Sequence, residues 1–168
     1  MAKRIDVTAV PVRTGSNYPP PFNLPCMALS RQQLGDAAGL SDFGVNRVRL
    51  PPGAWSSQRH WHTVEDEFVF VLEGEVVLVT DSGEETLRAG ECAGFKAGVK
   101  DGHHLQNRSD RDALVLDIGS RRVADDEGEY SDIDMVFLKG DGGYAYKDGR
   151  PYPKTPTAVA TGVPSASG

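Results

Sequence analysis

The sequence contains little cysteine, no long apolar run and no excess of positive charge. Its two cysteines, Cys26 and Cys92, are far apart and form no CxxC pair, so we expect free thiols in a reducing cytoplasm. No run approaches the ~18 apolar residues of a membrane span, and the N-terminus lacks the apolar core of a signal peptide. The formal net charge of -6 disfavours binding by phosphate neutralisation, so neither nucleic acid nor a membrane is expected as a partner.

Turn-forming residues, by contrast, are abundant. The 168 residues include 19 glycines and 11 prolines, which indicates one domain with many turns and short strands. From Val45 to about Gly119, runs rich in β-branched and aromatic residues alternate with turns, a pattern typical of an all-β sandwich or barrel. The expected strands are 45–50, 67–72, 75–80, 84–88, 91–96, 103–107 and 113–118.

Composition divides the chain into four segments. Residues 1–44 are expected to be an extended N-terminal arm and lead-in, because prolines are frequent in the first 25 residues. Residues 45–119 form the barrel core, and residues 120–154 an extension that packs on the barrel with one outer strand at 133–138. Residues 155–168 are small and unpatterned, which predicts a flexible C-terminal tail.

Three of the four histidines and one glutamate fall in two clusters that suit a single metal site. His60 and His62 are two residues apart, so on a strand they face the same side. Glu67 reaches that side only if the chain bends at 63–65, and it would then point into an apolar interior, where a lone carboxylate is costly and a cation-bound one is not. With His103 from a later strand, this set suits a catalytic Fe, Mn, Ni or Zn ion, and the sequence does not choose among them.

Alternative ligands exist beside two members of this set. Glu65 is three residues after His62 and competes with Glu67. His104 is the neighbour of His103, and we expect it to face outward or to pack, since adjacent strand residues alternate.

Other residues are candidates for lining a ligand pocket. Arg47 and Arg49 share a strand face, which would clamp a carboxylate or phosphate if it points inward and would be solvated if it points outward. Trp55 either lines the pocket or packs at its edge. Asn107 is expected to fix a turn or to orient a metal-bound histidine. The pocket candidates are therefore Arg47, Arg49, Trp55, His104 and Asn107.

The two clusters resemble the two sequence motifs of the cupin superfamily. The first motif, G(X)5HXH(X)3,4E(X)6G, is matched with one additional residue after the first glycine, at Gly53, His60, His62, Glu67 and Gly74. The second motif, G(X)5PXG(X)2H(X)3N, is matched with Lys96 in place of proline and two additional residues before the histidine, at Gly90, Gly98, His103 and Asn107. The chain is similar in this respect to small bacterial single-domain metal-binding cupins. The resemblance implies a double-stranded β-helix (jelly-roll) barrel, one divalent metal per chain held by three histidines and one glutamate, and a homodimer.

Three functions are compatible with these features. The first is a metal-dependent isomerase, lyase or dioxygenase acting on a small polar molecule. The second is a non-catalytic module that binds or senses a sugar or acid. The third is a DNA-binding regulator with a helix-turn-helix at residues 34–47, which is disfavoured because Gly35 and Gly44 would each cost a helix about 1 kcal/mol.

Overall fold

The structure is a computed structural model that describes residues 4–140 and 142–153. The described residues form short strands, one α-helix, α1 (Leu34–Ala38), and two 3-10 turns at Val7–Ala9 and Leu24–Cys26. The strands of the arm and of the first half of the barrel are β1 (Val12–Thr14), β2 (Ser30–Gln33), β3 (Phe43–Leu50), β4 (His60–His62), β5 (Glu67–Glu73), β6 (Glu75–Thr80) and β7 (Gly83–Arg88). The later strands are β8 (Cys92–Phe95), β9 (His104–Gln106), β10 (Ala113–Ser120), β11 (Gly128–Tyr130), β12 (Val136–Phe137) and β13 (Tyr144–Ala145).

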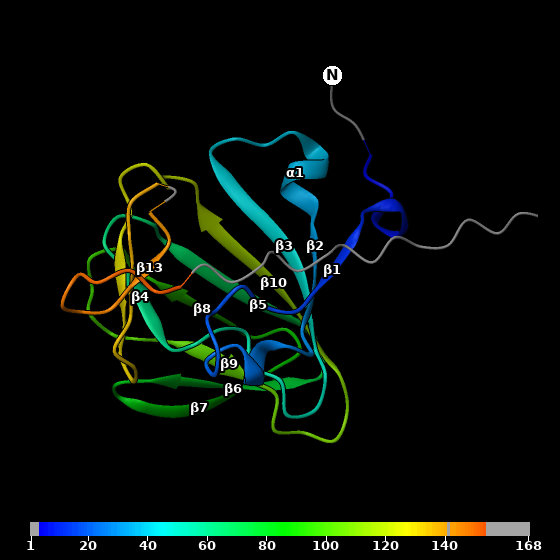
Figure 1. Cartoon of the computed structure of the whole chain (residues 1–168). Helices are drawn as coiled ribbons and strands as arrows, with labels where there is room; N and C mark the ends of the chain where they lie inside the picture. The colour runs from blue at the N-terminus through cyan, green and yellow to red at the C-terminus, as the bar shows by residue number, and fades with distance from the viewer. Residues whose placement is uncertain (1–3, 141, 154–168) are drawn as a thin grey trace, which may run out of the picture.

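The strands form three antiparallel sheets that enclose one interior (Figure 1). The largest sheet has the order β1-β2-β3-β10-β5-β8, and a three-stranded sheet has the order β7-β6-β9. The third sheet, β13-β12-β11-β4, lies across the barrel from β1 and β2 (Figure 1). The expected all-β barrel is confirmed.

The core is built on the inward rows of the large sheet. Val48, Val115 and Val71 are directly opposed on β3, β10 and β5, and each is at most 1% exposed. Burying a valine side chain stabilises a fold by about 1.5–3 kcal/mol, so this row alone is a substantial part of the stability. Because side chains alternate along a strand, the register fixes which residues of the neighbouring strands also face inward.

The N-terminal arm is extended, as its prolines predict, and it adds two strands to the sheet of its own chain. β1 pairs with β2, and β2 pairs with β3. The short α1 separates β2 from β3, and β3 occupies the place that a recognition helix would need. The helix-turn-helix alternative is therefore contradicted.

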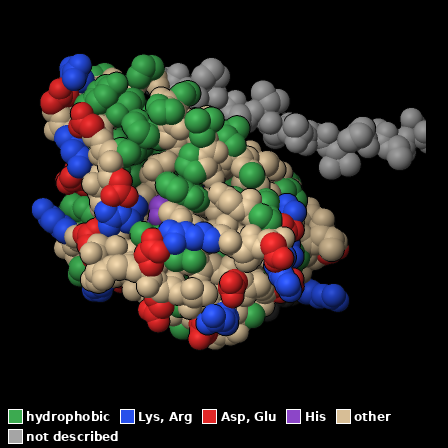
Figure 2. Space-filling model, turned by 90° about the horizontal axis from the view of Figure 1, so that it is seen from below, with side chains coloured by type: hydrophobic (Ala, Val, Ile, Leu, Met, Phe, Trp, Pro, Cys, Tyr) green, Lys and Arg blue, Asp and Glu red, His purple; other side chains and the backbone are tan. Residues whose placement is uncertain are grey.

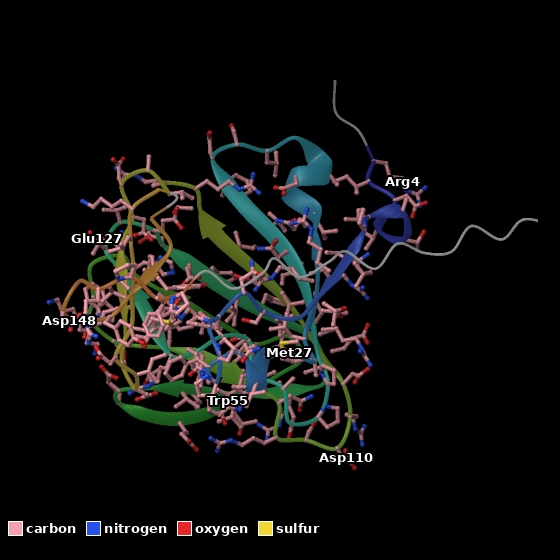
Figure 3. The ribbon with its side chains drawn as sticks, in the orientation of Figure 1. Arg4, Met27, Trp55, Asp110, Glu127 and Asp148 are labelled. Carbon is pink, nitrogen blue, oxygen red and sulfur yellow. The ribbon has the colours of Figure 1, made fainter. Side chains whose placement is uncertain are left out.

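The segment after β10 forms β11, β12 and β13 beside β4, and labelled Glu127 and Asp148 lie on this side of the molecule (Figure 3). The strand expected at 133–138 is shorter in the structure, because a backbone hydrogen bond from Met135 to Ile133 makes a turn before β12. The predicted tail at 155–168 lies outside the described residues. Both cysteines are free, with Cys26 buried and Cys92 exposed. In the part of the chain that the structure describes, no helix has the length and apolarity to span a membrane.

Candidate metal centre

Three separate elements bring the four predicted ligands together. His60 and His62 are the two ends of β4, and Glu67 begins β5 after a break at 63–66, which includes the bend predicted at 63–65. His103 immediately precedes β9 and forms an isolated bridge with His60, in which the amide of each residue donates to the carbonyl of the other, at 2.9 and 3.2 Å. The backbone therefore holds two of the imidazoles side by side.

The Nε2 atoms of all three histidines point at one carboxylate oxygen. Glu67 Oε2 lies 2.8 Å from His103 Nε2, 3.4 Å from His62 Nε2 and 3.8 Å from His60 Nε2. Donor atoms that share one ion at bonds of about 2.1 Å lie roughly 3.0–3.4 Å apart, which the distance between His62 and Glu67 matches and the other two approach. His60, His62 and Glu67 form a group that is able to hold an ion.

The other ring nitrogen of each histidine faces an acceptor, which leaves Nε2 for the ion. His60 Nδ1 lies 2.9 Å from the Gln58 carbonyl, and His103 Nδ1 lies 3.3 Å from the Asp101 carbonyl. His62 Nδ1 lies 2.5 Å from Oδ2 of Asp126. In His60 and His62 such partners select the tautomer in which Nε2 carries a lone pair. His103 Nε2 instead makes a hydrogen bond with Glu67 Oε2 at 2.8 Å in this structure.

Asp126 is a buried neighbour of the candidate site that the sequence did not reveal. It is 4% exposed, and its Oδ1 accepts the Val64 amide at 2.9 Å while Oδ2 faces His62. Its distance of 64 residues from His62 hides the contact, and its position in the polar run 125–129 gives no pattern that would reveal it.

Packing and electrostatics set the protonation states of the site. The Phe95 ring stacks on His103 with a centroid distance of 3.6 Å and an interplanar angle of 1°. Burial lowers the pKa of His60 to about 4. Burial would raise the pKa of Glu67, but the His103 hydrogen bond and the neighbouring imidazoles lower it to about 2. A neutral imidazole and an ionised carboxylate are the forms that bind a metal.

The cluster borders a cavity of about 820 Å³ inside the barrel. Its wall combines the site with apolar barrel residues and with the arm segment Val12–Tyr18. A smaller cavity of about 200 Å³ borders His62, Glu67, Phe95 and His103 from the other side. In Figure 2 a histidine side chain is visible in a hollow beside Lys or Arg side chains. The site is therefore enclosed and still reachable by a small molecule.

The alternative ligands lie elsewhere. Glu65 Oε1 accepts the amide of Arg122 instead of joining the three Nε2 atoms. Glu65, His62 and Asp126 form a second group of possible ligands, but Asp126 is already occupied by backbone donors and by His62. His104 borders the large cavity, yet its Nδ1 contacts the Ser57 carbonyl at 2.9 Å.

Two of the predicted pocket residues, Arg47 and Arg49, do not border the cavity. Val48 faces inward, so Arg47 and Arg49 face the opposite side of β3, where Arg47 donates to Gln32 and Arg49 to Asp112. The inward alternative for these arginines is wrong for this reason.

Trp55 and Asn107 have structural positions. Trp55, labelled in Figure 3, packs edge-on against His104 with a centroid distance of 4.8 Å and does not border either cavity among the described residues. Asn107 is fully buried, and its amide donates to the carbonyls of Leu50 and Arg111, which fixes the turn before β10.

The replacement of the motif proline by Lys96 has a local explanation. Lys96 Nζ contacts Asp66 at 2.9 Å, and the same carboxylate accepts the Ala97 amide at 2.8 Å. An ion pair and a backbone hydrogen bond thus hold the loop that a proline ring would otherwise stiffen.

Comparison with known proteins identifies the family of this chain. Residues 46–119 match the family model described as cupin domain. A Silicibacter pomeroyi structure named as a sugar phosphate isomerase from a cupin superfamily is 45% identical, with a TM-score of 0.85, over 90% of this chain and 97% of that chain. The chain belongs to the cupin superfamily.

Two further structures show how widely this cupin barrel is used. One is a protein of Acidithiobacillus ferrooxidans, provisionally named a sugar phosphate isomerase. It is 26% identical, with a TM-score of 0.66, over 72% of this chain and 76% of its own. The polyketide cyclase RemF of Streptomyces resistomycificus shares only the fold, at 20% identity and a TM-score of 0.55, over 71% of this chain and 80% of its own. No curated protein matches the sequence significantly.

Proposed function

We propose that this cupin binds one divalent first-row metal through His60, His62, Glu67 and His103 and isomerises a small phosphorylated sugar. The convergence of three Nε2 atoms on one Glu67 oxygen, inside a cavity, carries the proposal. The isomerase chemistry and the substrate class are supported by the name of the 45% identical relative. When bound, the metal would supply a Lewis acid for substrate oxygens.

Isomerisation of a sugar also needs a group that moves a proton between neighbouring carbons. Asp117 of β10 borders the cavity, and it is directly opposed to Val69, two residues beyond Glu67 on β5. Burial raises the pKa of Asp117, which makes its carboxylate a stronger proton acceptor. We assign proton transfer to Asp117, which was missed from the sequence although it is the lone charge in an otherwise apolar run, Ala113–Ile118.

Elemental analysis by mass spectrometry of protein purified without chelator tests the metal site. We expect about one equivalent of a first-row metal per chain, lost in His60→Ala and His103→Ala. His104→Ala is the matched control, since it removes a neighbouring buried imidazole whose nitrogens point elsewhere, and it is expected to keep the metal. Absence of metal after reconstitution, or full occupancy in His60→Ala, would contradict the site.

Turnover tests the chemistry separately. The metal-loaded protein would be incubated with a panel of aldose and ketose phosphates and followed by NMR, with Asp117→Asn as the variant. We expect isomerisation by the wild type, and retention of metal with loss of turnover in Asp117→Asn. Tight binding of a sugar phosphate without turnover would instead favour the non-catalytic binding module.

A homodimer and a cytoplasmic location stay predictions from the sequence. Light scattering coupled to size-exclusion chromatography tests the dimer directly.

A further inference from the structure

The register of the arm places two arginines on the inner face of the large sheet. Arg13 of β1 is directly opposed to Arg31 of β2, and Arg31 is directly opposed to Val48 of β3. Directly opposed residues of antiparallel strands project to the same face, and Val48 faces the barrel interior. Both arginines accordingly border the large cavity.

This arrangement places positive charge on the cavity wall that the described residues neutralise only in part. Like charges that are directly opposed across two strands repel each other. Arg31 Nε is buried and has no hydrogen-bond partner among the residues that the structure describes. The ion pair of Arg31 with Asp117 is loose, with 3.8 Å between Nη2 and Oδ2. Two guanidinium groups therefore border one cavity, and both are also reached by solvent.

The outward-facing arginines of the same sheet provide the contrast. Arg47 Nη1 donates to Gln32 at 2.8 Å, and Arg49 Nε donates to Asp112 at 2.6 Å. These donors are satisfied within the protein. The inward pair lacks such partners in the part of the chain described, as expected for groups that bind a ligand.

Asp117 lies between this pair and the candidate metal centre. Arg31 reaches Asp117, and Asp117 is one inward row from Glu67, because Asp117 opposes Val69 and Gly119 opposes Glu67. One inward row is two residues, or roughly 7 Å along a strand. A small molecule that extends from the Arg31–Asp117 contact toward Glu67 would lie between the arginines and the candidate metal centre.

We infer that Arg13 and Arg31 form an anion subsite that binds the phosphate group of the substrate, with the arm supplying one of the two guanidinium groups. The inference rests on the proposed function for the identity of the substrate, while the binding of the anion itself does not require the metal. A planar guanidinium group binds two phosphate oxygens at once, and the single ammonium group of a lysine does not reproduce this geometry.

Calorimetric titration with inorganic phosphate, in parallel with acetate, tests the subsite in the full chain. The background is His60→Ala, so that phosphate has no metal to bind. We expect phosphate to bind, Arg31→Gln to weaken binding by about tenfold or more, and Arg13→Gln to weaken it less, since one or two charge-assisted hydrogen bonds are removed. Arg31→Lys should restore only part of the affinity.

Arg49→Gln is the matched control, because it removes the same charge from the outer face of the neighbouring strand. Equal weakening by Arg31→Gln and Arg49→Gln would reduce the effect to net charge and overturn the inference, as would unchanged binding in both Arg31→Gln and Arg13→Gln. Acetate binding as tight as phosphate would overturn the phosphate assignment. Because Arg13 is on the exposed edge strand, its variant gives a result even where an Arg31 variant fails to fold.

The outcome separates this inference from the proposed function. Phosphate binding that depends on both arginines, together with a wild-type protein that takes up no metal after reconstitution, would support the subsite and contradict the metal-dependent isomerase. A metal-loaded protein that isomerises sugar phosphates with unchanged KM in Arg31→Gln would support the enzyme and contradict the subsite.

Discussion

Replacement of Asp126 by asparagine is expected to weaken metal binding without removing a ligand. Oδ2 of Asp126 lies 2.5 Å from His62 Nδ1, and Oδ1 accepts the amides of Val64 and Glu65. In Asp126→Asn the amide oxygen continues to accept the two backbone donors, which places the NH2 group against His62. A donor at that position requires Nδ1 to accept, so the ring proton moves to Nε2 and blocks the lone pair that faces the ion.

The magnitude derives from the loss of one orienting partner. Replacing such a partner typically costs 10- to 100-fold in metal affinity, or about 1.4–2.7 kcal/mol. Rotation of the new amide offers no relief, because its NH2 group would then face the amides of Val64 and Glu65. The effect should therefore be at the upper end of that range, about 2 kcal/mol or more.

Competition with a chelator of known affinity measures this change. Asp125→Asn is the control, since Asp125 is the neighbouring residue, its side chain is exposed, and the substitution removes the same charge. We expect wild-type affinity in Asp125→Asn and a loss of about thirtyfold or more in Asp126→Asn. An Asp126→Asn protein that binds metal within about twofold of wild type would refute the orienting role.

Two further predictions concern the fold. Burial lowers the pKa of His60 to about 4 from 6.5, so the unfolded chain binds more protons between these values. The metal-free protein should lose stability as pH falls from 6.5 toward 4, which urea unfolding would show as a lower midpoint. The midpoint should change less with pH in His60→Ala. A midpoint that rises on acidification would contradict this prediction. Gly74 has φ +74°, and a Cβ there would lie 2.7 Å from the Asp112 carbonyl oxygen, whereas Gly53 has φ +81° and open space. Both Gly74→Ala and Gly53→Ala introduce backbone strain, and Gly74→Ala should cost about 1–3 kcal/mol more because of overpacking. Equal melting temperatures of the two variants would contradict the close approach at Gly74.

The strands of the barrel were predictable because each satisfies two local rules together. In β6 and β10, β-branched and aliphatic residues form a run that ends at turn residues, so their positions can be inferred from the chain itself. The candidate ligands stand out in the sequence for a related reason. His60 and His62 have strand spacing, and the later cluster supplies His103 at the spacing of a known motif.

Residues that act through long-range contacts were not predictable in this way. Asp126 is brought to His62 by the pairing of β11 with β4, and β11 has only three residues, too few to be identified as a strand from the sequence. Arg47 and Arg49 could be placed on one face of a strand from their spacing, but which face is inward depends on the strands that flank β3. Spacing gives the period of a strand, and only pairing gives its orientation.

The N-terminal arm has a role in the cavity that its own sequence does not reveal. Its prolines correctly exclude an α-helix, but they give no sign of the strand with which the segment pairs. In the structure β2 pairs with β3 and β1 pairs with β2. The inward-facing row that contains Val48 on β3 therefore continues with Arg31 on β2 and Arg13 on β1. One register therefore makes an apparently peripheral arm part of the cavity wall and turns Arg47 and Arg49 away from it. The specificity of this cupin is accordingly expected to depend on the arm, while the reacting centre depends on the motif residues of the barrel.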